Sequence, residues 1–321
     1  MNGNTNAKRR AFLVASASGF AGLQFGLPQP IARAADAHAA PSSGGKAKSV
    51  ILFFLCGGAS HIDTWDMKPD APVEYRGPFA SRATSAPEIR LCEHLPQLAK
   101  QAHHLAIIRS VCSTVSTNDH HAGYYYNLTG HAPDSTFLSL GNDRRPYSDD
   151  WPYIGSVVGA RRPQRDGLPN ALTLPHMPSA PPYTRPGQFA ARLGVEFDPL
   201  YIQAARSEPL KFQAPSLVLS GDVTPDQLLS RQRLLEALDG ARRQFEKSAA
   251  EQLWEQHQQR TLDLLLSSNT TKVFDIASEP KAVRERYGQS VNATSLLMAR
   301  RLVEAEVPFI TVFWKEDEAL K

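Results

Sequence analysis

Three apolar runs of strand length stand out along the chain, and each is followed by a polar or charged stretch. The first, VILFFL at residues 50–55, combines β-branched and aromatic side chains without a polar interruption. A continuous apolar run of this length predicts a strand covered on both faces, so we expect a parallel strand in the centre of a sheet. The runs LAIIRSV at 105–111 and FITVFW at 309–314 predict two more strands.

Helical periodicity separates these runs. Apolar positions within residues 95–102 recur at helical spacing, which predicts a helix there. Together with the apolar runs on either side, this helix would form a strand–helix–strand crossover. A second helix is expected to start near Asp119 and end at Gly130, because glycine often closes a helix. A third is predicted over residues 290–306. This order of elements predicts an α/β domain with a mostly parallel central sheet.

The remaining regions are less regular. Residues 143–212 are rich in proline and arginine and have weak periodicity, which predicts long loops and short elements over one edge of the sheet. A short strand at 217–219 and a helix capped by Thr224 should follow, with an amphipathic pattern up to Leu266. Only a charged stretch follows the last predicted strand, so we expect a sheet that is incomplete at the C-terminus.

The first 34 residues, 1–34, have the order of an export signal: a basic cluster, an apolar stretch and small-residue cleavage sites. Arg-Arg-x-Phe-Leu at 9–13 resembles the twin-arginine pattern of proteins exported in the folded state. The alternative is a chance basic start. We therefore expect the twin-arginine export machinery as a partner and a periplasmic or otherwise exported location. Residues 35–48 have the composition of a linker, which leaves 49–321 as the folded domain.

Composition narrows the classes of function. The 321 residues are 42% hydrophobic with a formal net charge of +3, as in a globular protein. Because basic residues are dispersed among a similar number of acidic ones, a nucleic-acid partner is not indicated. Beyond the leader, no stretch approaches the roughly 18 to 20 apolar residues of a membrane span. Of the three cysteines, only Cys92 and Cys112 form a pair worth testing as a disulfide, since Cys56 lies in a strand-like run.

Two polar clusters follow predicted strands, and ligands of parallel sheets gather where the carboxyl ends of the strands meet. The first cluster is GGASHIDTWD at 57–66, with Asp63 as its candidate ligand. The second is STVSTNDHHAG at 113–123, and its candidate residues are Asn118, Asp119, His120 and His121. Carboxylate and imidazole groups on one rim suit a divalent metal, with zinc, calcium and magnesium all open.

Each candidate also has a structural interpretation. Asp63 and Asp66 could form Asx turns. Asn118 or Asp119 could cap the helix that follows. The two adjacent histidines point to different sides of a helix, so at most one serves a site directly.

The start of this helix also favours an anion. Its unpaired amides and its dipole would stabilise a phosphate or sulfate oxygen over residues 118–121, and a metal beside it would add to the effect. Arg109, at the end of a predicted strand, either holds an anionic substrate or makes a structural ion pair.

The order of several motifs resembles a family of exported proteins known as domain of unknown function 1501, which is placed in the alkaline phosphatase and sulfatase superfamily. The motifs are the twin-arginine leader, GGASHIDTWDMKPDAP, LCEHLPQLAK, RSV, NDHHAGYYYNLTGH and YGQS...LLMARRLVEAEVPFITV. The resemblance covers residues 49 to about 314.

This resemblance implies a three-layer α/β sandwich of the alkaline phosphatase type, with metal ligands on loops and a nucleophile at a helix N-terminus. Asp63 matches the metal aspartate after the first strand. LTGH at 128–131 is similar to the end of the sulfatase nucleophile helix, which places the nucleophile near Asp119 or His120. The Cys/Ser-x-Pro-x-Arg pattern of sulfatases is absent, and the later Asp and His motifs are missing, so the resemblance implies a C-terminally truncated member.

We therefore expect an exported, metal-dependent hydrolase of a small anionic phosphate or sulfate ester, or of a glycan-linked ester. The expected metal ligands are Asp63, Asp119 and His120. The expected catalytic residues are Asn118, His121 and Arg109. The alternative is a non-catalytic exported binding or assembly protein on the same scaffold, because a fold does not guarantee an activity.

Overall fold

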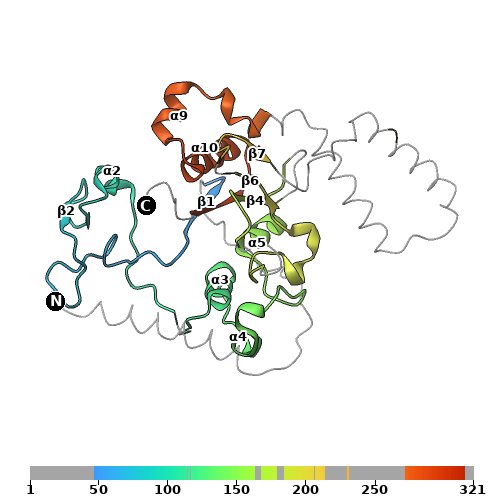
Figure 1. Ribbon diagram of the computed structural model, residues 1–321, viewed down its shortest axis with the longest axis horizontal. Helices are drawn as coiled ribbons and strands as arrows, with labels where there is room; N and C mark the ends of the chain where they lie inside the picture. The colour runs from blue at the N-terminus through green and yellow to red at the C-terminus, as the bar shows by residue number, and fades with distance from the viewer. Residues whose placement is uncertain are drawn as a thin grey trace, which may run out of the picture. The chain divides into compact units, whose positions relative to one another are not determined.

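The computed structural model describes residues 47–113, 115, 117–162, 168–178, 184–205, 207–213, 230 and 272–314 (Figure 1). The structural findings below concern these residues. The predicted export signal, most of the linker, the strand at 217–219 and the helix from Thr224 lie outside them.

The main sheet has four described strands in the order β1-β8-β4-β5, and all neighbouring pairs are parallel. These strands are β1 (Val50–Leu55), β4 (Ala171–Leu174), β5 (Leu200–Tyr201) and β8 (Phe309–Trp314). Two antiparallel pairs form separate two-stranded sheets, and they are β2 (Ser81–Ala83) with β3 (Arg90–Cys92) and β6 (Gln203–Ala204) with β7 (Phe212–Gln213).

The described α-helices differ widely in length. They are α2 (Pro96–Ala99), α3 (His120–Thr129), α4 (Ser135–Leu140), α5 (Ile154–Arg161), α9 (Lys281–Tyr287) and α10 (Val291–Glu304). Single 3₁₀ turns lie at Ala102–His104, Gly141–Asp143, Ala191–Leu193, Val195–Phe197 and Ile276–Ser278. None of the helices in these ranges has the length and apolar character needed to cross a membrane.

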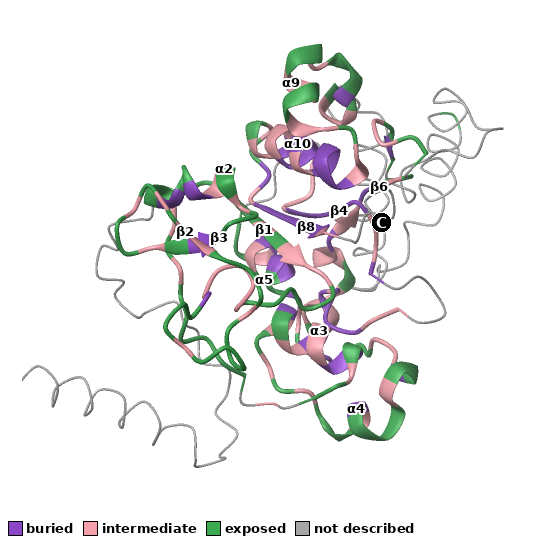
Figure 2. Cartoon of the chain, turned by 60° about the vertical axis from the view of Figure 1, so that its left-hand side comes forward, coloured by how far each residue is buried: buried purple, intermediate pink, exposed green. Residues whose placement is uncertain are grey.

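β8 runs through the middle of the core. Its side chains alternate between the two faces of the sheet, as the two-residue period of a strand requires. Ile310 and Val312 pack into a cluster with α10, whereas Phe309 and Phe313 pack into a second cluster with residues of α3 and α5. Figure 2 shows α10 on one side of β8 and β4, with α5 and α3 on the other. The predicted α/β class with a mostly parallel central sheet is therefore confirmed.

The helix predicted over residues 290–306 is also confirmed, as α10. The Ser290 side chain caps its start by accepting a hydrogen bond from the Ala293 N–H at 3.2 Å. Leu297, Met298 and Leu302 are fully buried against the sheet. This apolar face explains why α10 forms a stable layer beside β8.

The position of β1 differs from the prediction. The strand forms over residues 50–55, but it lies at the edge of the described sheet and pairs there with β8 alone. Val50, Ile51 and Phe53 are between 41% and 48% exposed. The prediction of a central strand was therefore wrong for the described sheet. A continuous apolar run indicates that both faces of a strand are covered, but it does not indicate whether both of its edges are paired.

The strand predicted over residues 105–111 is not present. This segment belongs to no described strand, and Ile108 and Val111 are 72% and 78% exposed. The helix before it is reduced to α2 and one 3₁₀ turn, so the strand–helix–strand crossover is not formed. Apolar and β-branched residues favour a pleated, half-buried environment, but a strand also needs a partner strand from a distant part of the chain.

The region 143–212 was predicted as long loops and short elements over one edge of the sheet. Short elements are present there, but their place in the sheet is corrected. It supplies β4, which lies between β8 and β5 and is buried at all four residues. It also supplies α5, which packs against β4 and β8. A buried strand of four residues among prolines is too short to give a periodic signal.

The disulfide considered for Cys92 and Cys112 is not formed. Both thiols are free, with Cys92 buried in β3 and Cys112 exposed. The structure therefore gives no covalent link between the β2–β3 pair and the segment that leads to α3.

Replacing Leu297 by alanine tests the packing of α10 on the sheet. We expect Leu297→Ala to lower the free energy of unfolding by about 2 to 5 kcal/mol, because a fully buried leucine leaves a cavity. Urea denaturation followed by circular dichroism measures the change. Leu138→Ala is the matched control, since Leu138 on α4 is 90% exposed and its loss should change stability by less than about 0.5 kcal/mol. Equal midpoints for the two variants would contradict the packing described.

Candidate functional site

Several polar and aromatic side chains meet beyond the carboxyl ends of β1, β8 and β4, where ligands of parallel sheets collect. Cys56 follows β1, and its N–H donates to the Trp314 carbonyl at 3.1 Å, which marks the matching end of β8. His176 follows β4 by two residues, and its ring lies 6.3 Å from that of Phe313. From α3, Tyr124 reaches the same place and interacts with Cys56 through its hydroxyl.

The position of Tyr124 comes from packing on the sheet. Its ring lies 5.2 Å from the ring of Phe54 in β1 and 6.2 Å from that of Phe313 in β8. Burial raises the pKa of Tyr124 well above its ordinary value, so the hydroxyl stays protonated at neutral pH. The first turns of α3 are in this way held beside the carboxyl ends of the strands.

The start of α3 follows the helix-capping alternative. The Ala122 N–H donates to Oδ1 of Asp119 at 2.7 Å, and Asp119 itself has extended backbone angles. The helix ends at Gly130 with φ 73°, as predicted from the glycine. Asn118 precedes the cap and is exposed. Asp119 therefore satisfies one free amide of the helix with one of its two carboxylate oxygens.

The two histidines at the start of α3 have different environments. His120 is exposed, whereas His121 is buried. Nδ1 of His121 lies 2.9 Å from the carbonyl oxygen of Arg144. Because a carbonyl oxygen only accepts, Nδ1 must carry the hydrogen. Burial is the largest influence on the pKa of His121 and lowers it, so the imidazole is neutral at neutral pH.

Arg185 supplies positive charge at this place. Its guanidinium carbon lies 4.2 Å from the centre of the Tyr124 ring, and its charge further lowers the pKa of His121. The Nε atom of Arg185 is buried and has no hydrogen-bond partner among the described residues. A cation therefore stands beside the helix start, where the dipole of α3 also favours negative charge.

The first polar cluster is organised around other contacts. Asp63 lies in a turn after β1, and its Oδ1 atom is buried without a hydrogen-bond partner within the described residues. The backbone of Gly77 packs against this carboxylate, because a Cβ atom at Gly77 would lie 1.8 Å from Oδ1. Asp66 pairs with Lys68 at 2.6 Å and with Arg109 at 3.5 Å. Arg109 thus makes the ion pair that was one of its two interpretations.

The predicted residues come together only in part. Asp119 and Arg185 both lie close enough to His121 to act on its pKa, in opposite directions. Within the described ranges, no three His, Cys, Asp or Glu side chains gather as ligands of one metal ion. The partnerless oxygen of Asp63 is the kind of atom that a cation would satisfy. The described part of the chain therefore offers Asp63 as a single candidate metal ligand and no group of three ligands around it.

Four residues at this place were missed in the sequence. Cys56 could have been found, because it directly follows a predicted strand. Tyr124 could also have been found, since it lies four residues after His120 and three after His121, and residues at both spacings are neighbours on the surface of a helix. Arg185 and His176 lie in a region without periodicity, and their relation to α3 depends on how β4 enters the sheet.

Comparison with protein families supports one assignment. The model of a family described as protein of unknown function, DUF1501, matches residues 47–316. The chain therefore belongs to the DUF1501 family. Searches among curated proteins and among solved structures gave no match.

The Asp119 cap can be tested by substitution. We expect Asp119→Ala to lower the free energy of unfolding by about 0.5 to 2 kcal/mol, because the Ala122 N–H loses its acceptor. Asp119→Ser is the control, because a serine hydroxyl also accepts at this position and should retain most of the stability. Both variants are compared with the parent protein by urea denaturation. Equal losses in both variants would show that the side chain does not act as a cap.

Proposed function

We propose that this protein is an exported member of the alkaline phosphatase and sulfatase superfamily that binds a small phosphate or sulfate ester at the start of α3. The observation that carries the proposal is the place of Arg185. Its guanidinium lies 4.2 Å from the Tyr124 ring centre and acts electrostatically on His121, so it stands beside the N-terminal turns of α3.

The chemistry of this place favours an anion over a neutral ligand. A helix N-terminus offers free amides and the positive end of a dipole, and arginine forms strong, charge-assisted hydrogen bonds to phosphate-type oxygens. The Nε–H of Arg185 is an unused donor within the described residues. Asn118, which is exposed just before the helix, would add an amide donor.

Hydrolysis would require a group that accepts a proton from water. His121 is neutral and carries its hydrogen on Nδ1, so the lone pair is on Nε2. A general base of this kind would contribute to attack on a phosphorus or sulfur centre. We therefore propose His121 as the base, with Arg185 and Asn118 as contacts of the ester oxygens.

A divalent metal remains part of the proposal only through Asp63, whose buried oxygen lacks a partner. Export is proposed on the basis of the twin-arginine leader in the sequence.

A non-catalytic binding protein is the second candidate. It is favoured by the residues at the start of α3, Asn-Asp-His-His-Ala at 118–122, which contain no serine, threonine or cysteine that could act as a nucleophile there. Such a protein would bind the anion in the same way without turning it over.

Phosphate binding and ester hydrolysis together test the proposal. Isothermal titration with inorganic phosphate and assays with aryl phosphate and aryl sulfate are run on the full chain, with and without a chelator. We expect Arg185→Gln to weaken phosphate binding by roughly tenfold or more, because a charge-assisted hydrogen bond contributes about 1.5 to 3 kcal/mol. Arg286→Gln is the matched control, since Arg286 is exposed on α9 and should leave binding unchanged.

The outcomes separate the candidates. Hydrolysis that is lost together with phosphate binding in Arg185→Gln supports an esterase. Phosphate binding without turnover supports the binding protein. The proposed site would be overturned if the parent protein neither bound phosphate nor hydrolysed an ester. Equal effects of Arg185→Gln and Arg286→Gln on phosphate binding would overturn it as well.

A further inference from the structure

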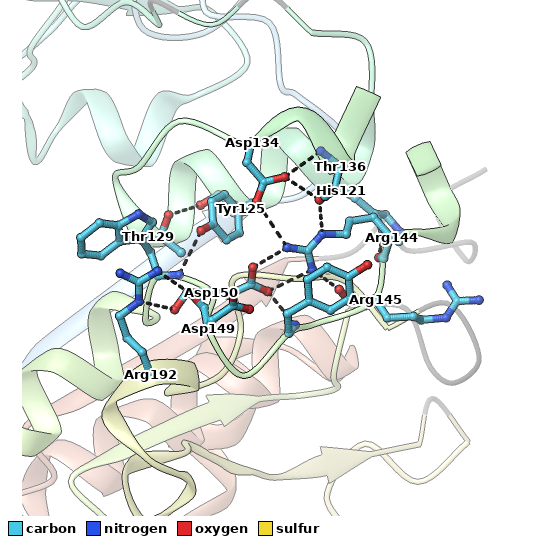
Figure 3. A network of polar contacts seen from close by, with 12 residues as sticks. His121, Tyr125, Thr129, Asp134, Thr136, Arg144, Arg145, Asp149, Asp150 and Arg192 are labelled. Atoms are coloured by element: carbon cyan, nitrogen blue, oxygen red, sulfur yellow. Dashed lines mark hydrogen bonds and ion pairs between the residues drawn. The ribbon is translucent and has the colours of Figure 1, made fainter. Parts of the chain in front are cut away.

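Arg144 is a buried charge with an unusually complete set of partners. Its side chain has no exposed surface, and it forms an ion pair with the buried carboxylate of Asp150 through two nitrogens. Its Nε–H donates to the Thr136 hydroxyl at 2.7 Å, and the rings of Phe137 and Tyr147 enclose the guanidinium at 4.7 and 3.5 Å. Figure 3 shows the Arg144 guanidinium between the side chains of Asp150 and Thr136.

Stability alone is a weak explanation for such a pair. Desolvation of both charges offsets much of their attraction, and apolar replacements of buried ion pairs are often neutral or stabilising. A buried pair does, however, hold one geometry strongly, because moving either partner leaves a charge without compensation. The question is therefore which group the pair keeps in place.

The main chain of Arg144 connects the pair to α3. Its carbonyl oxygen accepts the Nδ1–H of His121 at 2.9 Å. One helical turn later, the Tyr125 hydroxyl accepts from the Trp151 N–H at 3.0 Å, next to Asp150. α3 is thus attached to the segment 144–151 at two points on one side, and the side chains of Arg144 and Asp150 link those points.

We infer that Arg144 and Asp150 are positioning residues that hold His121 in the tautomer with hydrogen on Nδ1. The fixed carbonyl occupies the only donor of the neutral ring, so Nε2 keeps its lone pair and accepts hydrogen bonds. The role of His121 as a base rests on the proposed ester-binding function. The tautomer itself does not, because it follows from the contact with Arg144.

Nitrogen NMR of the full chain with labelled histidine tests this inference. At about pH 8, well above the ordinary histidine pKa, the parent protein should give one protonated and one unprotonated ring nitrogen for His121, with the proton on Nδ1. His121→Gln identifies the signal by removing it. Hydrogen on Nε2 in the parent protein would overturn the inference without any further variant.

Asp150→Asn is the main variant, because it retains the shape of the side chain and removes the charge that holds Arg144. We expect the His121 signals to become an average of the two tautomers. Arg144→Lys should give a similar, weaker effect. An unchanged Nδ1–H tautomer in a folded Asp150→Asn protein, as judged by circular dichroism, would overturn the inference.

Glu279→Gln is the matched control for a general loss of stability. Glu279 is also a nearly buried carboxylate paired with two arginines, Arg300 and Arg301, but it lies before α9. The substitution Glu279→Gln should lower the stability of the protein and leave the NMR signals of His121 as they are in the parent protein. Loss of the tautomer in Glu279→Gln as well would show that the effect is not specific to Arg144 and Asp150.

Activity gives a separate result. If the protein hydrolyses an aryl ester, Asp150→Asn should lower kcat by about 100-fold with little change in KM, as expected for a misplaced base. An unchanged kcat would contradict the positioning role in catalysis. If the parent protein hydrolyses none of the esters, the proposed hydrolase fails, and the NMR comparison still decides the positioning of His121.

Discussion

The structure depends on the parallel pairing of β8 with strands on both of its sides. β1 and β4 are about 120 residues apart in the sequence, and β8 joins them by hydrogen bonds along one edge each. Its alternating side chains also separate the α10 core from the core formed with α3 and α5. Because the three strands share one direction, their carboxyl ends lie together, and this brings Cys56 and His176 to the place where Tyr124 of α3 packs on the sheet.

A second constraint is polar and lies around α3. The helix packs on the sheet through Tyr124 and Leu128, and on the adjoining part of the same side it is held through His121 and Tyr125. The apolar contacts set the distance of the helix from the sheet, whereas the hydrogen bonds determine its rotation and its position along its axis. A buried polar network of this kind is specific because each member needs its partners.

The strongest sequence signals predicted the elements that the structure shows. VILFFL, FITVFW and the apolar face of 290–306 describe local periodicity, which is sufficient to predict β1, β8 and α10. The glycine at 130 and the aspartate at 119 likewise predicted the ends of α3 from turn and cap chemistry. The order of the strands could not be predicted in this way. The interior place of β4 and the absence of a strand at 105–111 both depend on contacts between distant segments of the chain.

The candidate site was predicted with similar limits. The places of Asp119 and His121 at the start of α3 follow from cap chemistry, whereas Arg109, which was expected at the end of a strand, lies in none of the described strands. Its ion pair with Asp66 is one of the two interpretations that the sequence left open. Arg144 could not have been identified from the sequence, because an arginine among the charged residues 143–150 gives no sign of being buried. The role of Arg185 depends on the path of the chain after β4, which no local pattern describes.

The edge position of β1 has a consequence for the behaviour of the protein in solution. Among the described strands, β1 leaves one row of peptide groups without a neighbour, and Val50, Ile51 and Phe53 present apolar surface beside that row. Peptide groups of this kind act as a template on which any extended apolar chain can be added. Within the part of the chain that the structure describes, this row is therefore where a further extended segment would lengthen the sheet.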